Sequence, residues 1–302
     1  MNTVVTFSSY GGPDVLALSN ADVPRPGPGQ VRIRVRAVAV NPIDAKIRSG
    51  RMDGIFRVQF PVLPGWDVAG VVDAAGEGAT AAVGDEVFGV AAVGGYSEYA
   101  LLDRPVPKPA ALSWETAAAV VTVGEAAFRV LKHLGLKAGQ TLLILGAGGS
   151  VGTIAVQLAT ARGITVIGTA ADGDIGRLTE LGATAVRYGD GWAERVRAAA
   201  PGGVGAVFDT AGTGLLPDAI SLAGDRARVI TIADDNFADH GVRFTGADPA
   251  DRAPESLPEL AALLASGKLT VPVWRTYPLA EAAQAHADLD AGRNHGKLVL
   301  LP

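Results

Sequence analysis

The segment Thr141–Ala159 constrains the fold of this chain more than any other, because it joins an expected strand to a glycine turn and a helix. Its apolar run Leu142–Leu145 is typical of a strand covered on both faces. Small residues follow at A-x-G-x-x-G spacing, which lets the backbone turn tightly and approach a pyrophosphate at the positive end of the next helix. This context predicts dinucleotide binding rather than a purely structural turn. The residues expected to contact the cofactor here are Ala147, Gly149, Ser150, Val151 and Gly152.

Length and composition restrict the class of protein. The 302 residues favour two domains, and 48% hydrophobic with 19% charged residues suits a globular chain with a large core. A net charge of −5 without a basic run argues against nucleic-acid binding. We expect neither a membrane span nor a signal peptide, because no apolar stretch approaches about 18 residues and the start lacks a basic region. The absence of cysteine excludes disulfides and cysteine zinc sites and fits a cytoplasmic protein.

The pattern of the chain changes near Ser113. Before it the chain is β-rich: Val31–Arg36 alternates apolar and cationic residues, which predicts a strand with a solvated arginine face rather than an anion site. Further strands are expected at 68–72 and 85–89. Ser113 is expected to cap a helix that runs through residues 117–134 and ends at Gly135.

After that helix, strands alternate with helices, which predicts an α/β fold with a doubly wound parallel sheet. Strands are expected at 141–145, 164–167, 206–209 and 228–232, and helices at 151–162, 174–181 and 215–223. After Gly267 the chain returns to short strands around one helix at 280–289. We expect this last piece to rejoin the β-rich first domain.

Several further motifs occur in order along nearly the whole chain. They are Asn41-Pro-Ile-Asp44 with Ile47–Gly50, Leu63–Val72, Val83–Gly89, Gly94–Ala100 and Gly296–Leu300. Together with the glycine turn they resemble the zinc-free quinone oxidoreductase and enone reductase branch of the medium-chain dehydrogenase/reductase superfamily. The resemblance implies a GroES-like catalytic domain at 1–115, completed by 268–302, and an inserted Rossmann domain at 116–267.

The resemblance also implies that no metal is used. Zinc members of the superfamily carry a cysteine near the position of Asn41 and Gly-His-Glu where this chain has Gly65-Trp66-Asp67. Their structural zinc needs four cysteines, and this chain has none. The four histidines, at positions 133, 240, 286 and 295, are expected at the surface.

Without a metal, hydrogen-bond donors must stabilise the negative charge that hydride transfer places on the acceptor oxygen. That requirement suits a quinone or an α,β-unsaturated carbonyl. Asn41 is the first candidate donor, although an Asn before a proline also suits a turn. Lys46 is the second, in place of the tyrosine common in quinone reductases, with a solvated surface lysine as the alternative. Asp44 would orient Lys46 or Arg48, or close the turn, and Tyr96 is a weaker candidate.

The second strand of the expected Rossmann domain ends in Thr169-Ala-Ala171, without the carboxylate that binds ribose hydroxyls in NAD enzymes. This favours NADPH over NADH, although Asp172 follows closely. Arg177 is expected to replace the lysine with which relatives bind the 2′-phosphate. The further cofactor contacts that the resemblance implies are Thr169, Tyr188, Ile232 and Lys297.

The leading function is therefore NADPH-dependent reduction of a small-molecule quinone or enone. The alternatives are an enoyl-thioester reductase and a non-catalytic dinucleotide-binding structural or regulatory protein. Relatives usually form homodimers through the far edge of the Rossmann sheet, expected here at 228–232 and 242–246.

Overall fold

The computed structural model describes residues 1–54, 57–246 and 248–302. It divides into two compact units: the first unit comprises Met1–Thr122 and Leu257–Pro302, and the second unit comprises Val123–Ser256. The divisions expected from the sequence lie instead at 115/116 and 267/268. Helix α3 (Val121–Leu134) begins next to the first observed division and α8 (Ser256–Ala265) next to the second.

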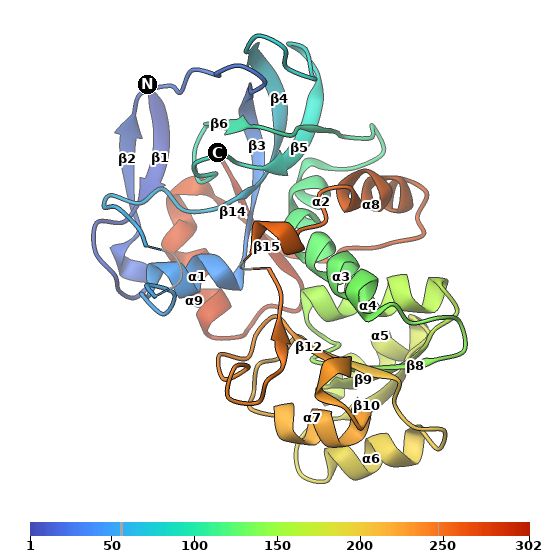
Figure 1. The fold of residues 1–302 in the computed structure, drawn as a ribbon. Helices are drawn as coiled ribbons and strands as arrows, with labels where there is room; N and C mark the ends of the chain where they lie inside the picture. Colours follow the sequence, from blue (N-terminus) through green and yellow to red (C-terminus); the bar gives the residue numbers. More distant parts are fainter. Residues whose placement is uncertain (55–56, 247) are drawn as a thin grey trace. The chain divides into compact units, whose positions relative to one another are not determined.

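The second unit contains a six-stranded parallel sheet in the order β10-β9-β8-β11-β12-β13 (Figure 1). Its strands are β8 (Thr141–Leu145), β9 (Thr165–Ala170), β10 (Thr184–Arg187), β11 (Ala206–Asp209), β12 (Val229–Thr231) and β13 (Arg243–Phe244). All strands are parallel, so their carboxyl ends share one edge, where ligands of open α/β sheets bind. The predicted doubly wound sheet is confirmed. Of the two segments expected at the far edge, 228–232 is internal, because β12 is paired on both sides. Strand β13, within the expected segment 242–246, forms this edge.

Helices cover both faces of this sheet. They are α4 (Ser150–Ala161), α5 (Ile175–Glu180), α6 (Trp192–Ala199) and α7 (Leu216–Ala223). From β8 the chain adds β9 and β10 on one side, and it then crosses back to add β11 and β12 on the other side of β8. Because such connections are right-handed, α4 and α5 lie on one face of the sheet and α6 and α7 on the other face. Figure 1 shows α4 above the strands and α6 and α7 below them. The apolar run Leu142–Leu145 is fully buried between these layers, as predicted.

The first unit contains a seven-stranded sheet in the order β14-β15-β3-β4-β5-β7, with β6 also paired to β3. Its strands are β3 (Val31–Val40), β4 (Asp67–Ala75), β5 (Glu86–Val90), β6 (Tyr99–Leu102), β7 (Val106–Pro107), β14 (Val273–Pro278) and β15 (Lys297–Leu301), and β1 (Asn2–Thr6) with β2 (Ala17–Ala21) forms a separate hairpin. In β3 the apolar Val31, Ile33 and Val35 are buried and the arginines between them face outward, as predicted. Arg32 pairs with Asp73 at 2.9 Å.

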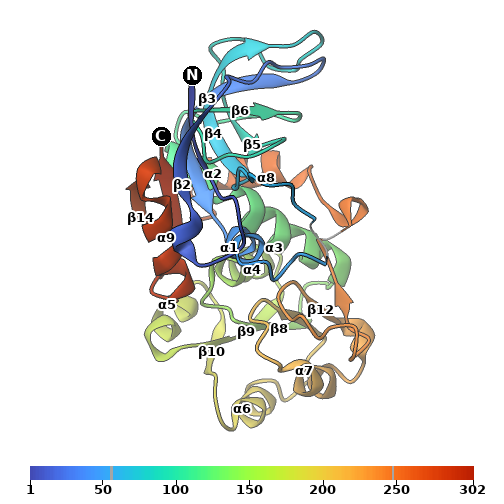
Figure 2. The ribbon, with the colours of Figure 1, turned by 90° about the vertical axis from the view of Figure 1, so that its left-hand side faces the viewer.

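The carboxyl-terminal segment completes this unit. Strand β15 pairs antiparallel with β3, with Leu298 opposite Val40. Helices α1 (Pro42–Arg48) and α9 (Ala282–Asp290) contact each other and lie side by side in Figures 1 and 2. The single helix expected after Ser113 is two helices, α2 (Trp114–Ala119) and α3, and the Ser113 hydroxyl caps α2 by accepting the Thr116 N–H at 3.1 Å.

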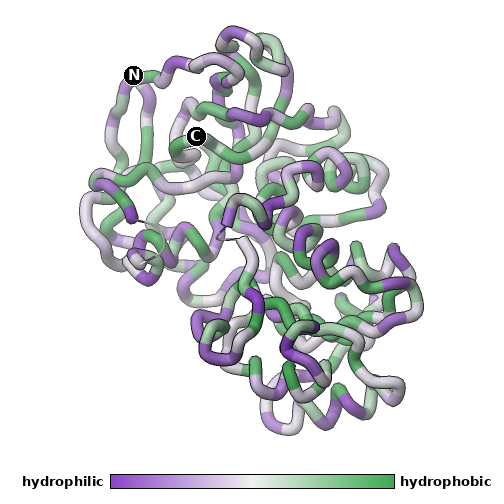
Figure 3. Tube along the Cα trace, in the orientation of Figure 1, coloured by the Kyte–Doolittle hydropathy of each residue, from purple (hydrophilic) through white to green (hydrophobic). Residues whose placement is uncertain are grey.

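Burial follows the hydropathy of the sequence. In Figure 3, polar and apolar positions alternate along α6 at the bottom of the view. This helix buries Trp192, Ala193 and Val196, and Ala199 is partly buried against the same core. Within the described ranges, every helix is too short or too polar to traverse a lipid bilayer.

Candidate functional site

The turn between β8 and α4 is closed by backbone hydrogen bonds and by glycine conformation. Gly146 has a φ of +77°, in the left-handed region that favours glycine. The N–H of Ala147 donates to the carbonyl of Thr169 at 2.9 Å, and the N–H of Gly149 donates to the carbonyl of Gly146 at 3.0 Å. A Cβ atom on Gly152 would lie 2.4 Å from the Gly146 carbonyl oxygen, so the helix can meet the turn only through a glycine.

This turn fits a dinucleotide phosphate. Ser150, Val151 and Gly152 are the first three residues of α4, and amides at these positions have no intrahelical acceptor. The positive end of the helix dipole points the same way. Gly149 has an extended backbone, and the nearest described atom to a Cβ there is the Gly146 carbonyl oxygen, at 3.3 Å. A side chain at Gly149 would therefore press against the turn itself, which favours glycine there.

Two residues expected to contact the cofactor brace this turn. Thr169 is buried, and its hydroxyl accepts the Gly146 N–H at 3.1 Å. Arg177 donates to the Gly148 carbonyl at 2.8 Å and to the Thr153 hydroxyl at 2.9 Å. Arg177 also donates to the Asp174 carboxylate at 2.7 Å. The guanidinium therefore holds the turn against α4 and α5, and its predicted contact with a phosphate stays a prediction.

A charged pair that the sequence analysis did not predict lies where the second strand ends. Arg187, the last residue of β10, is opposite Ala170, the last residue of β9. Its Nε lies 3.1 Å from Asp172 Oδ1. The next residue, Tyr188, is exposed, and its N–H donates to the Ala170 carbonyl at 3.2 Å. Only the parallel pairing of β9 and β10 could have revealed this proximity.

The ends of β11 and β12 are organised by a buried carboxylate. Asp209 accepts the Ala211 and Gly212 N–H groups at 3.0 and 3.1 Å and the Thr231 hydroxyl at 2.7 Å. Ile232, an expected cofactor contact, is half-buried and donates its N–H to the Asp209 carbonyl at 3.1 Å. The side chain of Asp209 thus shapes the sheet edge.

In the first unit, Asn41 is buried between two charged groups. Its Nδ2 donates to Asp67 Oδ2 at 2.8 Å, and its Oδ1 accepts from Lys297 Nζ at 2.5 Å. Lys297 also donates to the Val40 carbonyl at 3.0 Å. Both ends of the amide are fixed, so its orientation is defined by its partners. An amide has two N–H bonds, and Asp67 accepts one of them.

Asp67 and Lys297 compensate each other's charge. Asp67 also accepts the Thr122 hydroxyl at 2.6 Å and the Thr122 N–H at 3.0 Å. Burial raises the pKa of Asp67, and the Lys297 ammonium counteracts this shift. Burial likewise lowers the pKa of Lys297, and Asp67 counteracts it. The ammonium of Lys297 is buried and donates to Asn41, so it positions that side chain, and its expected contact with the cofactor stays a prediction.

A second buried chain of hydrogen bonds links α1 to α9. Asp44 Oδ2 accepts the Asn41 N–H at 2.9 Å and the Tyr96 hydroxyl at 3.4 Å. The Tyr96 oxygen lies 2.9 Å from His286 Nε2, and Arg48 Nη1 lies 2.9 Å from His286 Nδ1. Because a guanidinium can only donate, Nδ1 must accept, and the remaining ring hydrogen is on Nε2. His286 is therefore neutral, and the chain runs from Arg48 to Asp44.

The pKa values of this network are shifted by burial. Desolvation raises the pKa of Asp44 to about 7, and the nearby Asp67 carboxylate adds to the increase. Desolvation lowers the pKa of His286 to about 3, with a smaller contribution from the positive charge of Arg48. The pKa of Tyr96 is also raised well above its ordinary value, mainly by burial and by Asp44.

Of the roles expected for Asp44, the structure shows the closing of the turn, because its carboxylate accepts the Asn41 N–H at the start of α1. The guanidinium of Arg48 instead donates to His286 and lies 2.6 Å from Asp290. One expectation is wrong. Not all four histidines are at the surface, because His286 is fully buried. The sequence contains no local signal for this, since His286 lies on a short helix whose partner, α1, is far away in the chain.

Lys46 lies on α1 two residues after Asp44 and is half-buried. Asp44 and Arg48 lie on the same helix as Lys46. The ammonium that donates to Asn41 is that of Lys297. The structure thus brings Asn41 and Asp44 together, and Lys46 remains a predicted proton donor on the same element.

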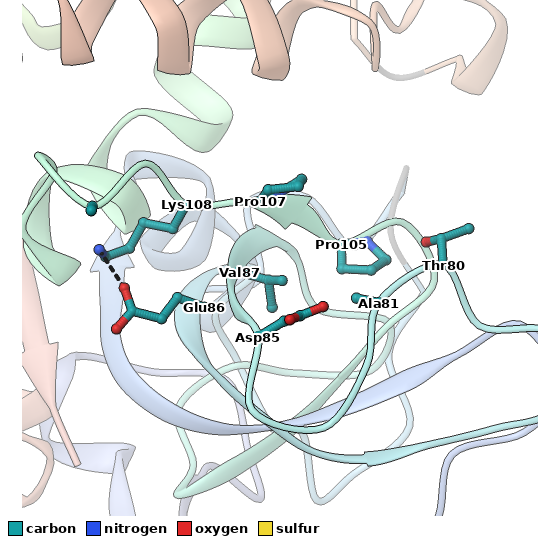
Figure 4. Close-up of a pocket in the computed structure, with 9 residues that line it drawn as sticks. Thr80, Ala81, Asp85, Glu86, Val87, Pro105, Pro107 and Lys108 are labelled. Carbon is teal, nitrogen blue, oxygen red and sulfur yellow. Dashed lines mark hydrogen bonds and ion pairs between the residues drawn. The ribbon is translucent and has the colours of Figure 1, made fainter.

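A hollow of about 300 Å³ lies elsewhere in the first unit, between residues 80–87 and 105–110 (Figure 4). Lys108 and Glu86 pair at its margin at 2.8 Å. Glu86 begins β5, whereas Val90, opposite Asp67, ends it. The hollow therefore lies at the end of β5 remote from the Asn41 network. Among the described residues, no three or more histidine and acidic side chains are grouped to hold a metal ion.

The chain matches two family models, an alcohol dehydrogenase GroES-like domain over residues 27–105 and a zinc-binding dehydrogenase over residues 181–300. It is 34% identical to a quinone oxidoreductase of Lama guanicoe over 98% of this chain and 96% of that protein. It is 31% identical to a 2-methylene-furan-3-one reductase of Solanum lycopersicum, over 98% of this chain and 78% of that protein.

Solved structures agree with these matches. The structure of the Escherichia coli quinone oxidoreductase complexed with NADPH superimposes with a TM-score of 0.89 at 27% identity, covering 99% of this chain and 100% of that one. The Coxiella burnetii quinone oxidoreductase gives a TM-score of 0.88 at 27% identity, covering 100% and 99%.

Proposed function

The chain belongs to the zinc-independent quinone oxidoreductase branch of the medium-chain dehydrogenase/reductase superfamily, and on that premise we propose that it transfers a hydride from NADPH to a quinone. The observation that carries the proposal is the glycine turn, with its close Gly152–Gly146 contact and the amides of Ser150, Val151 and Gly152 at the start of α4. The preference for NADPH rests on the end of β9, where Ala170 stands in place of a ribose-binding carboxylate. The NADPH complex of the Escherichia coli relative supports the same cofactor.

When bound, the nicotinamide supplies the hydride. The protein then has to stabilise the negative charge on the acceptor oxygen. Asn41 is suited to this role, because Asp67 and Lys297 fix its amide and leave one N–H of Nδ2 for an acceptor. The fixed orientation removes the need for reorganisation as the charge develops. Lys46, on the helix α1 that follows Asn41, is the proposed proton donor to the reduced acceptor.

An α,β-unsaturated ketone is the second candidate acceptor. The observation in its favour is the similarity to the Solanum lycopersicum 2-methylene-furan-3-one reductase over 98% of this chain. The same amide donor would serve it, because hydride addition to the β carbon also places negative charge on a carbonyl oxygen.

The test is NADPH oxidation by the purified protein with a small quinone and, separately, with a small enone. We expect turnover of the quinone that survives treatment with a chelator, and a higher kcat/KM with NADPH than with NADH. Asn41→Ala should lower kcat at least tenfold, about 1.4 kcal/mol, while the Kd for NADPH stays unchanged. Absence of turnover with both acceptors would refute the proposed activity.

We also propose that the protein is a homodimer that pairs through the edge of the second unit's sheet. Among the described residues, strand β13 (Arg243–Phe244) ends the strand order and is paired on one side, with β12. An unpaired edge exposes backbone donors and acceptors that a second copy can satisfy about a two-fold axis.

A further inference from the structure

The guanidinium of Arg187 reaches over the carboxyl end of β9. Arg187 is level with Ala170 across the parallel pair, and its Nε lies 3.1 Å from a carboxylate oxygen of Asp172, two residues beyond Ala170. In dinucleotide-binding sheets the adenosine ribose is bound at the end of this second strand. Arg187 is therefore a cation beside the ribose position.

The Arg187–Asp172 pair is open to solvent. The two side chains are 67% and 65% exposed. An exposed ion pair of this kind contributes little free energy, so a ligand phosphate can replace the carboxylate. The loop after β9 also leaves room, because a Cβ built on Gly173 or Gly176 meets no described atom within 4 Å.

The two other arginines of this region are bound to the protein itself. Arg177 donates to the Gly148 carbonyl, to Thr153 and to Asp174. Arg195, on α6, donates to the carbonyls of residues 187, 189 and 190. Releasing either guanidinium would break several hydrogen bonds, whereas among the described residues Arg187 has one side-chain partner, Asp172.

We propose that Arg187 binds the 2′-phosphate of NADPH and that Asp172 holds its guanidinium until the phosphate replaces it. This inference rests on the proposed function, since it assumes that the second unit binds the dinucleotide. Arg187 would then bind the phosphate that Arg177 is expected from its position in the sequence to bind. A guanidinium forms paired, charge-assisted hydrogen bonds with phosphate oxygens. Asp172 reduces the selectivity for NADPH over NADH, because its negative charge repels the 2′-phosphate.

The test compares adenosine 2′,5′-bisphosphate with 5′-AMP by calorimetry, because the two ligands differ only in the 2′-phosphate. The wild type should bind the bisphosphate more tightly. Arg187→Ala should weaken bisphosphate binding about tenfold, as expected for loss of a hydrogen bond between charged groups, and leave 5′-AMP binding unchanged. Asp172→Asn should strengthen bisphosphate binding. The matched control is Arg197→Ala, which removes the same charge from an exposed pair with Glu194 on α6 and should change neither affinity.

The outcomes separate this inference from the proposed function. If neither nucleotide binds the wild type, the dinucleotide site is refuted and this inference falls with it. If both bind and Arg187→Ala leaves their affinity ratio unchanged, Arg187 has no such role and the dinucleotide site stands. Loss of 5′-AMP binding in Arg187→Ala would also overturn the inference, because it would mean that Arg187 supports the whole site.

Discussion

Asp44 and His286 are joined through Tyr96 in the first unit. We expect their contributions to the free energy of unfolding to change with pH in opposite directions. Burial raises the pKa of Asp44 from 3.8 to about 7. Between these values the folded chain holds a proton that the unfolded chain has released. The stability that Asp44 contributes is therefore fully present below about pH 4 and is lost as the pH rises through about 7.

His286 acts in the other direction. Burial and Arg48 lower its pKa from 6.5 to about 3, so between these values the unfolded chain binds a proton that the folded chain does not. Its contribution is present above about pH 6.5 and is lost as the pH falls toward about 3. Each group changes the stability by about 1.4 kcal/mol per pH unit, and by about 4 to 5 kcal/mol over its whole range. From about pH 4 to 6.5 the two slopes cancel in the wild type.

Single variants should reveal the two slopes. We expect the stability difference between wild type and His286→Gln to grow by about 1.4 kcal/mol per pH unit from about pH 4 to 6.5. The difference between wild type and Asp44→Asn should shrink at a similar rate. Urea unfolding can be followed by tryptophan fluorescence in a Trp192→Phe background, because the other three tryptophans, Trp66, Trp114 and Trp274, lie in the first unit.

The exposed His295, in the same unit, supplies the matched control. His295→Gln is a surface substitution and should change the free energy of unfolding by less than about 0.5 kcal/mol. Differences that stay constant with pH for both buried-site variants would show that neither group changes its proton affinity on folding. Slopes of the same sign would contradict the assignment of a neutral His286 beside a protonated Asp44.

Three further predictions concern the turn, the buried lysine and the assembly. Gly149→Val should lower NADPH affinity at least tenfold by calorimetry, about 1.4 kcal/mol, at an unchanged Tm. Gly152→Val should instead lower the Tm, because its Cβ would lie 2.4 Å from the Gly146 carbonyl oxygen. Lys297→Met should lower the free energy of unfolding by about 3 to 5 kcal/mol, because it leaves Asp67 buried without its cation. The control Lys132→Met, at a side chain that is 62% exposed, should cost less than about 1 kcal/mol, and equal losses would contradict the argument. Light scattering should give about twice the chain mass of 30.7 kDa, and a monomer mass would argue against edge pairing.

The sequence was sufficient where the determining interactions are local. The apolar run of β8, the spacing of the glycine turn and the start of α4 lie within twelve residues of one another, Thr141–Gly152, and the structure has them as expected. The alternation in β3 likewise revealed which face of the strand is buried. Periodicity and turn chemistry express backbone geometry and solvent exposure, which neighbouring residues largely determine.

The partners of the polar side chains depended on the tertiary structure. Arg48 and His286 are separated by 238 positions and Asn41 and Lys297 by 256, and only the return of α9 and β15 to the first unit brings them together. In the same way, the parallel pairing of β9 with β10 places Arg187 at Asp172, whereas Arg177, the nearer candidate in sequence, binds the glycine turn. Hydropathy and spacing identify a buried position or a turn. A buried charge costs free energy unless a hydrogen bond or an opposite charge compensates it, and the compensating residue can come from any part of the chain that packs beside it. Long-range packing therefore determines the partner.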